Sequence, residues 1–183
     1  MIILNKYDKF IVGSDQVWNT SITNNDYTYF LDFVDNDEKK YSYAASFGYS
    51  NIPEDQVEKN RELLNKFKML NVREEQGKEI IKSISNKKVD VVVDPTFLLT
   101  KDQWEEMASL KEIKQDYILV YMPNFSKEVF DFIKNLAQQE NCKIIFLNDS
   151  IRKFSKMKVI HDSSPEQFLG LLRNAKYVVT GSF

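Results

Sequence analysis

The chain alternates short runs of β-branched and aromatic residues with longer segments in which apolar residues recur every three or four positions. The short runs predict strands and the longer segments predict helices. The run 89–93 is nearly continuous in valine and predicts a buried strand. Such alternation is typical of a parallel sheet whose strands are joined by crossover helices. The predicted strands lie near residues 10–12, 41–46, 70–73, 89–93, 117–122, 143–147, 158–160 and 177–179, and the predicted helices near 53–67, 74–84 and 102–108 and after Ser126 and Ser164.

Three of the predicted helices carry start signals. Pro53 suits the first position of its helix, and the acidic residues after it lie at the positive end of the helix dipole. Ser126 can cap the next helix. Ser164 is followed by a first-position proline and by Gln167, which completes a capping box. The buried faces are expected to comprise Val129, Phe130, Ile133, Leu136 and Ala137 in one helix and Phe168, Leu169, Leu172 and Ala175 in the other.

The alternation breaks after Asp94-Pro95, where residues 96–116 hold only one short helical pattern. We therefore expect a first domain at residues 1–99, a linker region at 100–116 and a second domain at 117–183. The last predicted strand runs into a turn with nothing after it, and no helix precedes the first strand. The sequence is therefore expected to be an internal piece of a longer protein.

The composition narrows the class of protein. A chain of 183 residues with 43% apolar residues can bury a core and is expected to be globular. No apolar run is long enough to span a membrane and no secretory signal is visible, so a cytoplasmic location is the default expectation. The net charge of −2, with the signs interspersed, leaves no basic stripe for nucleic acid.

Cys142 and His161 are the only residues of their types. An internal disulfide, a cysteine redox pair and a metal site rich in cysteine or histidine are therefore excluded, and we expect neither a metal nor a cofactor. Cys142 precedes an apolar run and is expected to be a buried structural thiol. No neighbouring nucleophile or carboxylate pattern points to His161, for which a surface or packed position is expected.

Short polar or glycine-containing segments follow the predicted strands. In parallel α/β sheets, ligands bind beyond the carboxyl ends of the strands, which is where these segments lie. Turns use the same residue types, and this alternative accounts for many of them without a ligand. The segments are Gly13-Ser14-Asp15-Gln16, Arg73-Glu74, Asp94-Pro95, Asn148-Asp149-Ser150 and Thr180-Gly181-Ser182.

Arg73 is the sharpest candidate because it lies where a predicted strand meets the start of a helix. Its guanidinium and the free amides of that helix could face one anion, such as a phosphate or a carboxylate. The alternative is an ion pair with Glu74, Glu75 or another acid in a solvated loop. Position alone does not separate the two.

The segment around Trp18 is open to two interpretations. Trp18 could stack on a sugar, but a tryptophan beside a buried strand is more often part of the core. Asp15 could orient a hydroxyl or hold its own turn. The segment lacks the spacing and lysine of a P-loop, and no GxGxxG occurs, so neither a nucleoside triphosphatase nor a nicotinamide enzyme is supported. The residues alone indicate an anion-binding α/β protein.

Several motifs resemble those of the polysaccharide pyruvyl transferase family, in the same order along the chain. Residues 43–48, 72–74 and 93–96 resemble its second signature, its arginine motif and its aspartate-proline turn. Residues 174–183 resemble the segment that precedes the family's histidine. The closest likeness is to the family's first signature, at residues 10–19, which include Gly13, Ser14, Asp15, Gln16, Trp18 and Asn19.

The resemblance implies a GT-B-like architecture, in which parts of two Rossmann-like domains with mostly parallel sheets border an active-site cleft. It implies an enzyme of polysaccharide or exopolysaccharide biosynthesis that transfers the pyruvyl group of phosphoenolpyruvate to a sugar. The acceptor would be a polysaccharide or lipid-linked oligosaccharide precursor, and the product a pyruvate ketal. Arg73 matches the family's donor-binding arginine. The family's general acid is the histidine immediately after the position of Phe183, so no catalytic residue and no activity are expected from this chain alone.

One departure from the family pattern concerns the donor site. Some members carry an arginine at the position of Ser182, where serine supplies less positive charge. Gln16, Trp18 and Asn19 match the first signature and could contact the acceptor or shape the loop. Two other functions stay open: a GT-B glycosyltransferase that uses a nucleotide sugar, and a non-catalytic glycan-binding or assembly module. A lipid-linked acceptor would allow peripheral association with a membrane.

Overall fold

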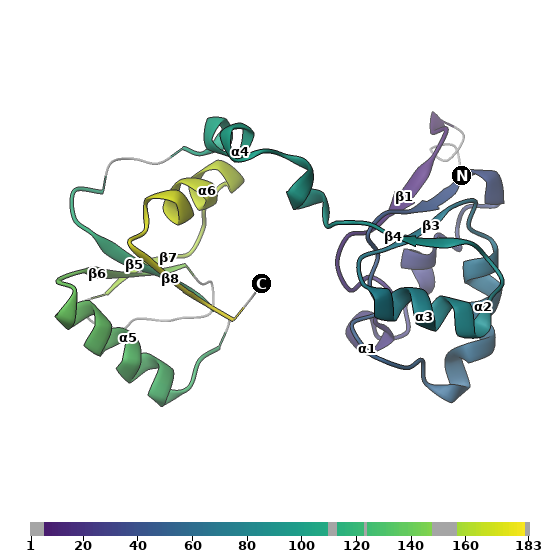
Figure 1. Ribbon diagram of the computed structural model, residues 1–183, viewed down its shortest axis with the longest axis horizontal. Coiled ribbons are helices and arrows are strands. Elements are labelled where there is room, and N and C mark those ends of the chain that lie inside the picture. The colour runs from purple at the N-terminus through teal and green to yellow at the C-terminus, as the bar shows by residue number, and fades with distance from the viewer. Residues whose placement is uncertain (1–5, 110–112, 123, 148–156, 182–183) are drawn as a thin grey trace. The chain divides into compact units, whose positions relative to one another are not determined.

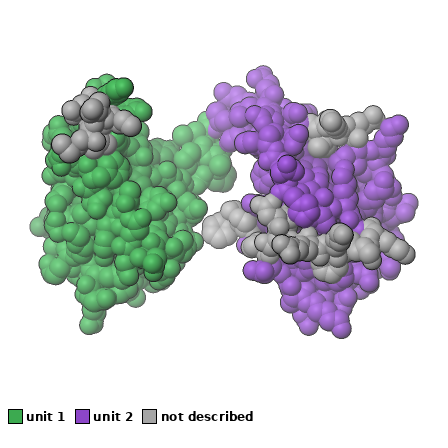
Figure 2. All heavy atoms as spheres, turned by 180° about the vertical axis from the view of Figure 1, so that it is seen from behind, with its two compact units in different colours: residues 1–98 green, residues 99–183 purple. Residues whose placement is uncertain are grey.

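The computed structural model describes residues 6–109, 113–122, 124–147 and 157–181. The chain forms two compact units, residues 1–98 and residues 99–183 (Figures 1 and 2). Every strand pairing within the described residues is parallel. The prediction of an α/β fold with mostly parallel sheets is thereby confirmed.

Strands and helices alternate in both units. The first unit contains β1 (Phe10–Val12), α1 (Thr20–Thr23), β2 (Lys40–Ser42), α2 (Val57–Asn65), β3 (Leu70–Val72), α3 (Glu75–Ile84) and β4 (Val89–Val91). Short 3-10 helices lie at Tyr27–Phe30, Asp37–Lys39, Glu54–Gln56 and Pro95–Leu98. The second unit contains α4 (Lys101–Met107), β5 (Tyr117–Tyr121), α5 (Lys127–Gln139), β6 (Lys143–Leu147), β7 (Lys158–Ile160), α6 (Pro165–Asn174) and β8 (Tyr177–Thr180).

In the first unit, two pairs of strands lie side by side in parallel. β1 pairs with β2, and β3 pairs with β4. The hydroxyl of Ser42 joins the two pairs, because it donates to the Asn71 carbonyl at 3.0 Å and accepts from the Asn71 N–H at 2.9 Å. Ser42 is fully buried, so its hydroxyl serves as the partner that a buried backbone group requires. The carboxyl ends of these four strands therefore share one edge of the unit.

Helices α2 and α3 lie on one side of these strands (Figure 1). Helix α3 contacts both β3 and β4, and its buried residues Ile80 and Ile81 join the core of the unit. Gly77 allows this close approach, because a Cβ at Gly77 would lie 3.3 Å from the Cβ of Val72. The start of α3 is thus held against the end of β3.

The sheet of the second unit has the order β7-β6-β5-β8. The chain builds outward from β5 through β6 to β7, and it then returns to the other side of β5 to form β8. This 3-2-1-4 order is the one found in Rossmann-like folds. Strand order reverses between β5 and β8.

Helices cover both faces of this second sheet, with α5 on one side and α6 on the other (Figure 1). Alternate residues of β5 face opposite layers: Ile118 and Val120 pack in the cluster with α5, and Tyr117 and Leu119 in the cluster with α6. Helix α4 packs on α6, where Arg173 pairs with Glu105 at 3.2 Å.

The predicted helix starts at Ser126 and Ser164 are confirmed. The Ser126 hydroxyl accepts from the N–H of Val129, and Ser164 and Gln167 form a capping box. The predicted start at Pro53 is wrong in detail, because Pro53 has extended backbone angles and precedes the 3-10 helix Glu54–Gln56. Helix α2 begins only at Val57.

Two predictions of burial also need correction. The buried stripe of α6 includes Leu171, which is 2% exposed and was missed, whereas Leu169 is not part of the apolar cluster. The valine-rich run 89–93 was predicted to be a buried strand, but β4 ends at Val91 and Val93 is 55% exposed. In the described residues β4 pairs only with β3, so it is an edge strand.

Candidate functional site

Side chains from three strand ends of the first unit meet at Asp94. The Ser14 hydroxyl, two residues after β1, donates to Asp94 Oδ2 at 2.5 Å. Arg73, immediately after β3, donates to the same oxygen from Nη1 at 3.4 Å. Asp94 itself follows β4. The structure thus brings together Ser14 and Arg73, both predicted site residues, through a carboxylate that the sequence had marked only as a polar turn.

The carboxylate of Asp94 is held on both of its oxygens. Oδ1 accepts from the backbone N–H of Thr96 at 3.0 Å and from its hydroxyl at 2.9 Å. The hydrogen bond from Ser14 is the main cause that lowers the pKa of Asp94 from 3.8 to about 2, and the N–H of Thr96 adds to it. Asp94 is therefore ionised at any pH at which the protein is expected to work.

Arg73 has two acidic neighbours. Its Nε donates to Glu74 Oε1 at 2.8 Å, and its Nη1 donates to Asp94. The hydrogen bond to Glu74, with a smaller contribution from Asp94, raises the pKa of Arg73 above its usual value. The ion pair that the sequence left open is present, with Glu74 and Asp94; Glu75 pairs instead with Lys78.

The guanidinium of Arg73 has N–H groups that form no hydrogen bond within the described residues. Its side chain is 22% exposed, and Nη2 makes no hydrogen bond with any residue that the structure describes. A guanidinium has five N–H groups in a planar fork, of which two are used here. The unused N–H groups can bind one carboxylate or phosphate. Arg73 also directly precedes Glu74, the residue at the start of α3, and no side chain caps the amides of that helix end.

Gly13 allows the loop after β1 to approach the chain after β2. Its φ of +122° is in the region that favours glycine, and a Cβ there would lie 2.0 Å from the carbonyl oxygen of Tyr43. Asp15 follows with a φ of +88°, and its Oδ1 accepts from the N–H of Gln16 at 2.8 Å. Asp15 thus holds its own turn, as one of the two interpretations of this residue expected.

Gln16 and Asn19 are linked through their side chains. The Asn19 amide donates to Gln16 Oε1 at 2.8 Å, and Asn19 Oδ1 accepts from the N–H of Ser21 at the start of α1. Gly48 leaves the space that the Gln16 side chain fills, because a Cβ at Gly48 would lie 2.0 Å from Gln16 Oε1. No pattern in the sequence indicated this role of Gly48.

Trp18 lies in the core of the first unit. It is fully buried, its indole N–H donates to the carbonyl of Tyr29 at 3.1 Å, and its ring stacks on Phe30. Phe47 and Phe67 complete the surrounding aromatic cluster. A ring enclosed in this way has no free face on which a sugar could stack.

The second unit has its own strand-end edge. The reversal of strand order between β5 and β8 places Tyr121 beside Thr180, with Gly181 following, at the point where Rossmann-like sheets bind ligands. A Cβ at Gly181 would touch the terminal methyl of Met122 at 3.4 Å. His161 is exposed after β7. Ser182, Phe183 and the segment Asn148-Asp149-Ser150 lie outside the described residues.

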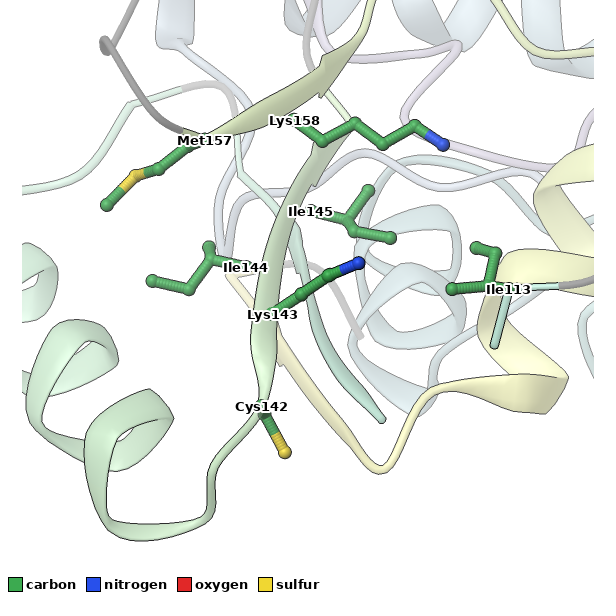
Figure 3. A pocket seen from close by; sticks show the side chains of 7 residues that line it. All are labelled: Ile113, Cys142, Lys143, Ile144, Ile145, Met157 and Lys158. Atoms are coloured by element: carbon green, nitrogen blue, oxygen red, sulfur yellow. The ribbon is translucent and has the colours of Figure 1, made fainter. Parts of the chain in front are cut away.

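A cavity of about 500 Å³ lies at the opposite, amino-terminal end of β6 and β7. Figure 3 shows Ile144 and Met157 extending to one side of β6 and Lys143, Ile145 and Lys158 to the other. Cys142, which is half-buried, also lines it. Because parallel sheets bind ligands at their carboxyl ends, this cavity is not assigned to the candidate site.

The described ranges contain no group of three or more His, Cys, Asp or Glu side chains that could hold a metal ion. None of the helices that the structure describes is long and apolar enough to cross a membrane.

Comparison with known proteins gives one family. A family model described as Polysaccharide pyruvyl transferase matches residues 2–183. No curated protein and no solved structure matches the chain.

Proposed function

Since this chain belongs to the polysaccharide pyruvyl transferase family, a family of transferases, we propose that its donor substrate is phosphoenolpyruvate. The acceptor in this proposal is a sugar of a polysaccharide or lipid-linked oligosaccharide precursor. The product is a sugar carrying a pyruvate ketal, and the location is the cytoplasm, with peripheral contact to a membrane where the acceptor is lipid-linked. The two units would then form the GT-B-like halves of the enzyme.

The observation that carries the choice of donor is the position of Arg73. Phosphoenolpyruvate has a carboxylate and a phosphate, and both are bound best by guanidinium groups and backbone amides. Arg73 ends β3 at the start of α3 and keeps Nη2 unused in the described structure. We assign Arg73 to binding one anionic group of phosphoenolpyruvate.

The local charge requires a rearrangement when the donor binds. Arg73 carries +1, and its partners Glu74 and Asp94 carry −1 each, so the three together carry −1. An anionic donor would be repelled unless one carboxylate moved away or other cations approached. Glu74 is 41% exposed and bonds to Arg73 through a single oxygen, so we propose that the donor displaces Glu74.

The reaction balances without a redox cofactor. The methylene carbon of phosphoenolpyruvate takes a proton, and the adjacent carbon, then cationic, is attacked by a sugar hydroxyl. A second hydroxyl of the sugar displaces the phosphate, which leaves as inorganic phosphate. One of the two hydroxyl protons restores the acid that protonated the methylene carbon, and the other leaves with the phosphate. We propose that the first proton comes from the histidine that follows the position of Phe183 in the family.

We propose different roles for the remaining candidate residues. Gly13, Ser14 and Asp15 shape the loop after β1 and hold Ser14 next to Asp94. The linked amides of Gln16 and Asn19 are candidates for contact with acceptor hydroxyls. The buried position of Trp18 supports a packing role for this residue. Ser182 is kept as a donor-side candidate from the family pattern alone.

The proposal is tested with the full-length protein, phosphoenolpyruvate and a sugar–lipid acceptor. Release of inorganic phosphate together with an acceptor that has gained one pyruvyl group is expected. Arg73→Gln should weaken donor binding while the thermal unfolding midpoint stays close to that of the wild type. A folded protein that releases no phosphate, and that is stabilised by a nucleotide sugar but not by phosphoenolpyruvate, would refute the proposed reaction.

A further inference from the structure

We propose that Asp94 is a positioning residue of the donor site, which holds the Arg73 guanidinium and the Ser14 hydroxyl in place from a fixed carboxylate. The inference rests on the proposed function of Arg73. Three strand-end segments of the first unit converge on Asp94, since Ser14, Arg73 and Thr96 all donate to it.

The two carboxylate oxygens of Asp94 accept hydrogen bonds from different parts of the chain. Both donors to Oδ1 come from Thr96, two residues further along the same loop, which is the geometry of an Asx turn. These two local bonds fix the orientation of the carboxylate. Oδ2 is left to face the other strand ends, and it accepts from Ser14, which is 80 residues away in the sequence, and from Arg73.

The two acidic neighbours of Arg73 differ in how firmly they are held. The carboxylate of Asp94 accepts four hydrogen bonds and its side chain is 22% exposed. Glu74 accepts one side-chain bond within the described structure, and its side chain is 41% exposed. Asp94 is therefore the permanent partner of Arg73, whereas Glu74 is the exchangeable one.

Anchoring Nη1 restricts the whole guanidinium because the group is planar. When Glu74 releases Nε, the bond from Nη1 to Asp94 still limits rotation of the fork. The remaining N–H groups of Nη1 and Nη2 are then already positioned to donate a pair of hydrogen bonds to the carboxylate or phosphate of phosphoenolpyruvate. A group fixed before binding loses less conformational entropy on binding.

An acid–base role for Asp94 does not fit the same surroundings. The hydrogen bonds that it accepts stabilise its ionised form, so it neither supplies a proton at neutral pH nor competes well for one. Its carboxylate would also repel an anionic donor at close range. Orientation of Arg73 and Ser14 is the role that these contacts allow.

The test compares variants of the full-length enzyme in steady-state assays with phosphoenolpyruvate and the sugar–lipid acceptor. Asp94→Asn should raise the KM for the donor about ten-fold or more, the usual effect of losing a hydrogen bond to a charged group, and leave the KM for the acceptor within about two-fold. Asp90→Asn is the matched control, because Asp90 lies on β4, is 54% exposed and pairs with Lys88 rather than with Arg73 or Ser14.

A double-mutant cycle separates positioning from general stabilisation. If Asp94 acts through Arg73, then Asp94→Asn combined with Arg73→Gln should raise the donor KM no further than Arg73→Gln alone. Asp94→Glu keeps the charge but displaces it, and it should recover only part of the loss. Fully additive effects, or complete recovery by Asp94→Glu, would overturn the inference.

Three further outcomes are informative. Should Asp94→Asn not fold, Ser14→Ala and Asp94→Glu decide instead, and a donor KM within two-fold of the wild type in both would overturn the proposal. If Arg73→Gln leaves the donor KM unchanged, the proposed function of Arg73 fails first. If Arg73→Gln raises it and Asp94→Asn does not, only the role of Asp94 fails.

Discussion

Replacing Glu74 with glutamine should tighten the binding of phosphoenolpyruvate. The carboxylate of Glu74 lies 2.8 Å from Arg73 Nε and competes with the donor for the same guanidinium. The glutamine oxygen can still accept that hydrogen bond, so the change removes the charge and leaves the shape almost intact. Donor binding then no longer has to break an ion pair or overcome the repulsion of a second carboxylate.

The size of the effect follows from the exposure of the pair. Glu74 is 41% exposed and Arg73 22% exposed, so their pair belongs with partly exposed ion pairs, which contribute up to about 1 kcal/mol. A gain of about 0.5–1 kcal/mol corresponds to a Kd that is about two- to five-fold lower. The gain should shrink at about 1 M salt, where screening acts over only about 3 Å.

The measurement is isothermal titration of phosphoenolpyruvate into the full-length protein, with Glu75→Gln as the control. Glu75 is the next residue, it carries the same charge, and its partner is Lys78 rather than Arg73. Removal of its charge should leave the Kd nearly unchanged. A Kd for Glu74→Gln equal to or higher than that of Glu75→Gln would contradict the exchange model.

Three other predictions follow from the first unit. Trp18→Ala should lower the free energy of unfolding by about 3–5 kcal/mol in urea denaturation, because it opens a cavity among Phe30, Phe47 and Phe67; an unchanged midpoint would contradict a core position. Gly48→Ala should cost about 1–2 kcal/mol, since its φ is +66°, and should displace Gln16; a neutral effect would mean that this loop adapts. The pKa of Asp94 is lower in the folded protein than in the unfolded chain, so its contribution to stability is complete above pH 4 and is lost as the pH falls towards about 2. In the Asp94→Asn variant, the free energy of unfolding should therefore fall less steeply with pH in this acidic range. If denaturation at several pH values gives the same pH dependence for the variant and the wild type, the hydrogen bonds to Asp94 are contradicted.

Local patterns predicted the elements of this fold well. The predicted strand near 143–147 is the same as β6, and the caps at Ser126 and Ser164 were visible because a capping motif involves residues only three apart. The buried face of α6 was assigned wrongly. Residues 168, 171, 172 and 175 have the i, i+3, i+4 and i+7 spacing of one helix face, whereas Leu169 lies about 160° from Leu171 around the helix. The helical period therefore selects Leu171 over Leu169.

The sequence predicted individual residues of the candidate site but not the long-range contacts between them. The sequence placed Arg73 at the junction of a strand and a helix and named Glu74 as an alternative partner, and both features are present. The bond from Ser14 to Asp94 spans 80 residues and depends on the spatial arrangement of four strands, which local periodicity does not reveal. The enclosure of Trp18 likewise depends on aromatic residues from three separate segments.

The hydroxyl of Ser42 has a consequence for the alignment of relatives of this chain. Both of its hydrogen bonds are made with the backbone of Asn71, so a relative with alanine at this position would leave a buried N–H without its partner. Serine, or another residue with a small hydroxyl, is therefore expected here in every relative that keeps the junction between β2 and β3. A ranking of positions by invariance would select Ser42 among the candidates for catalysis, although its invariance would reflect the assembly of the strand layer that carries Arg73.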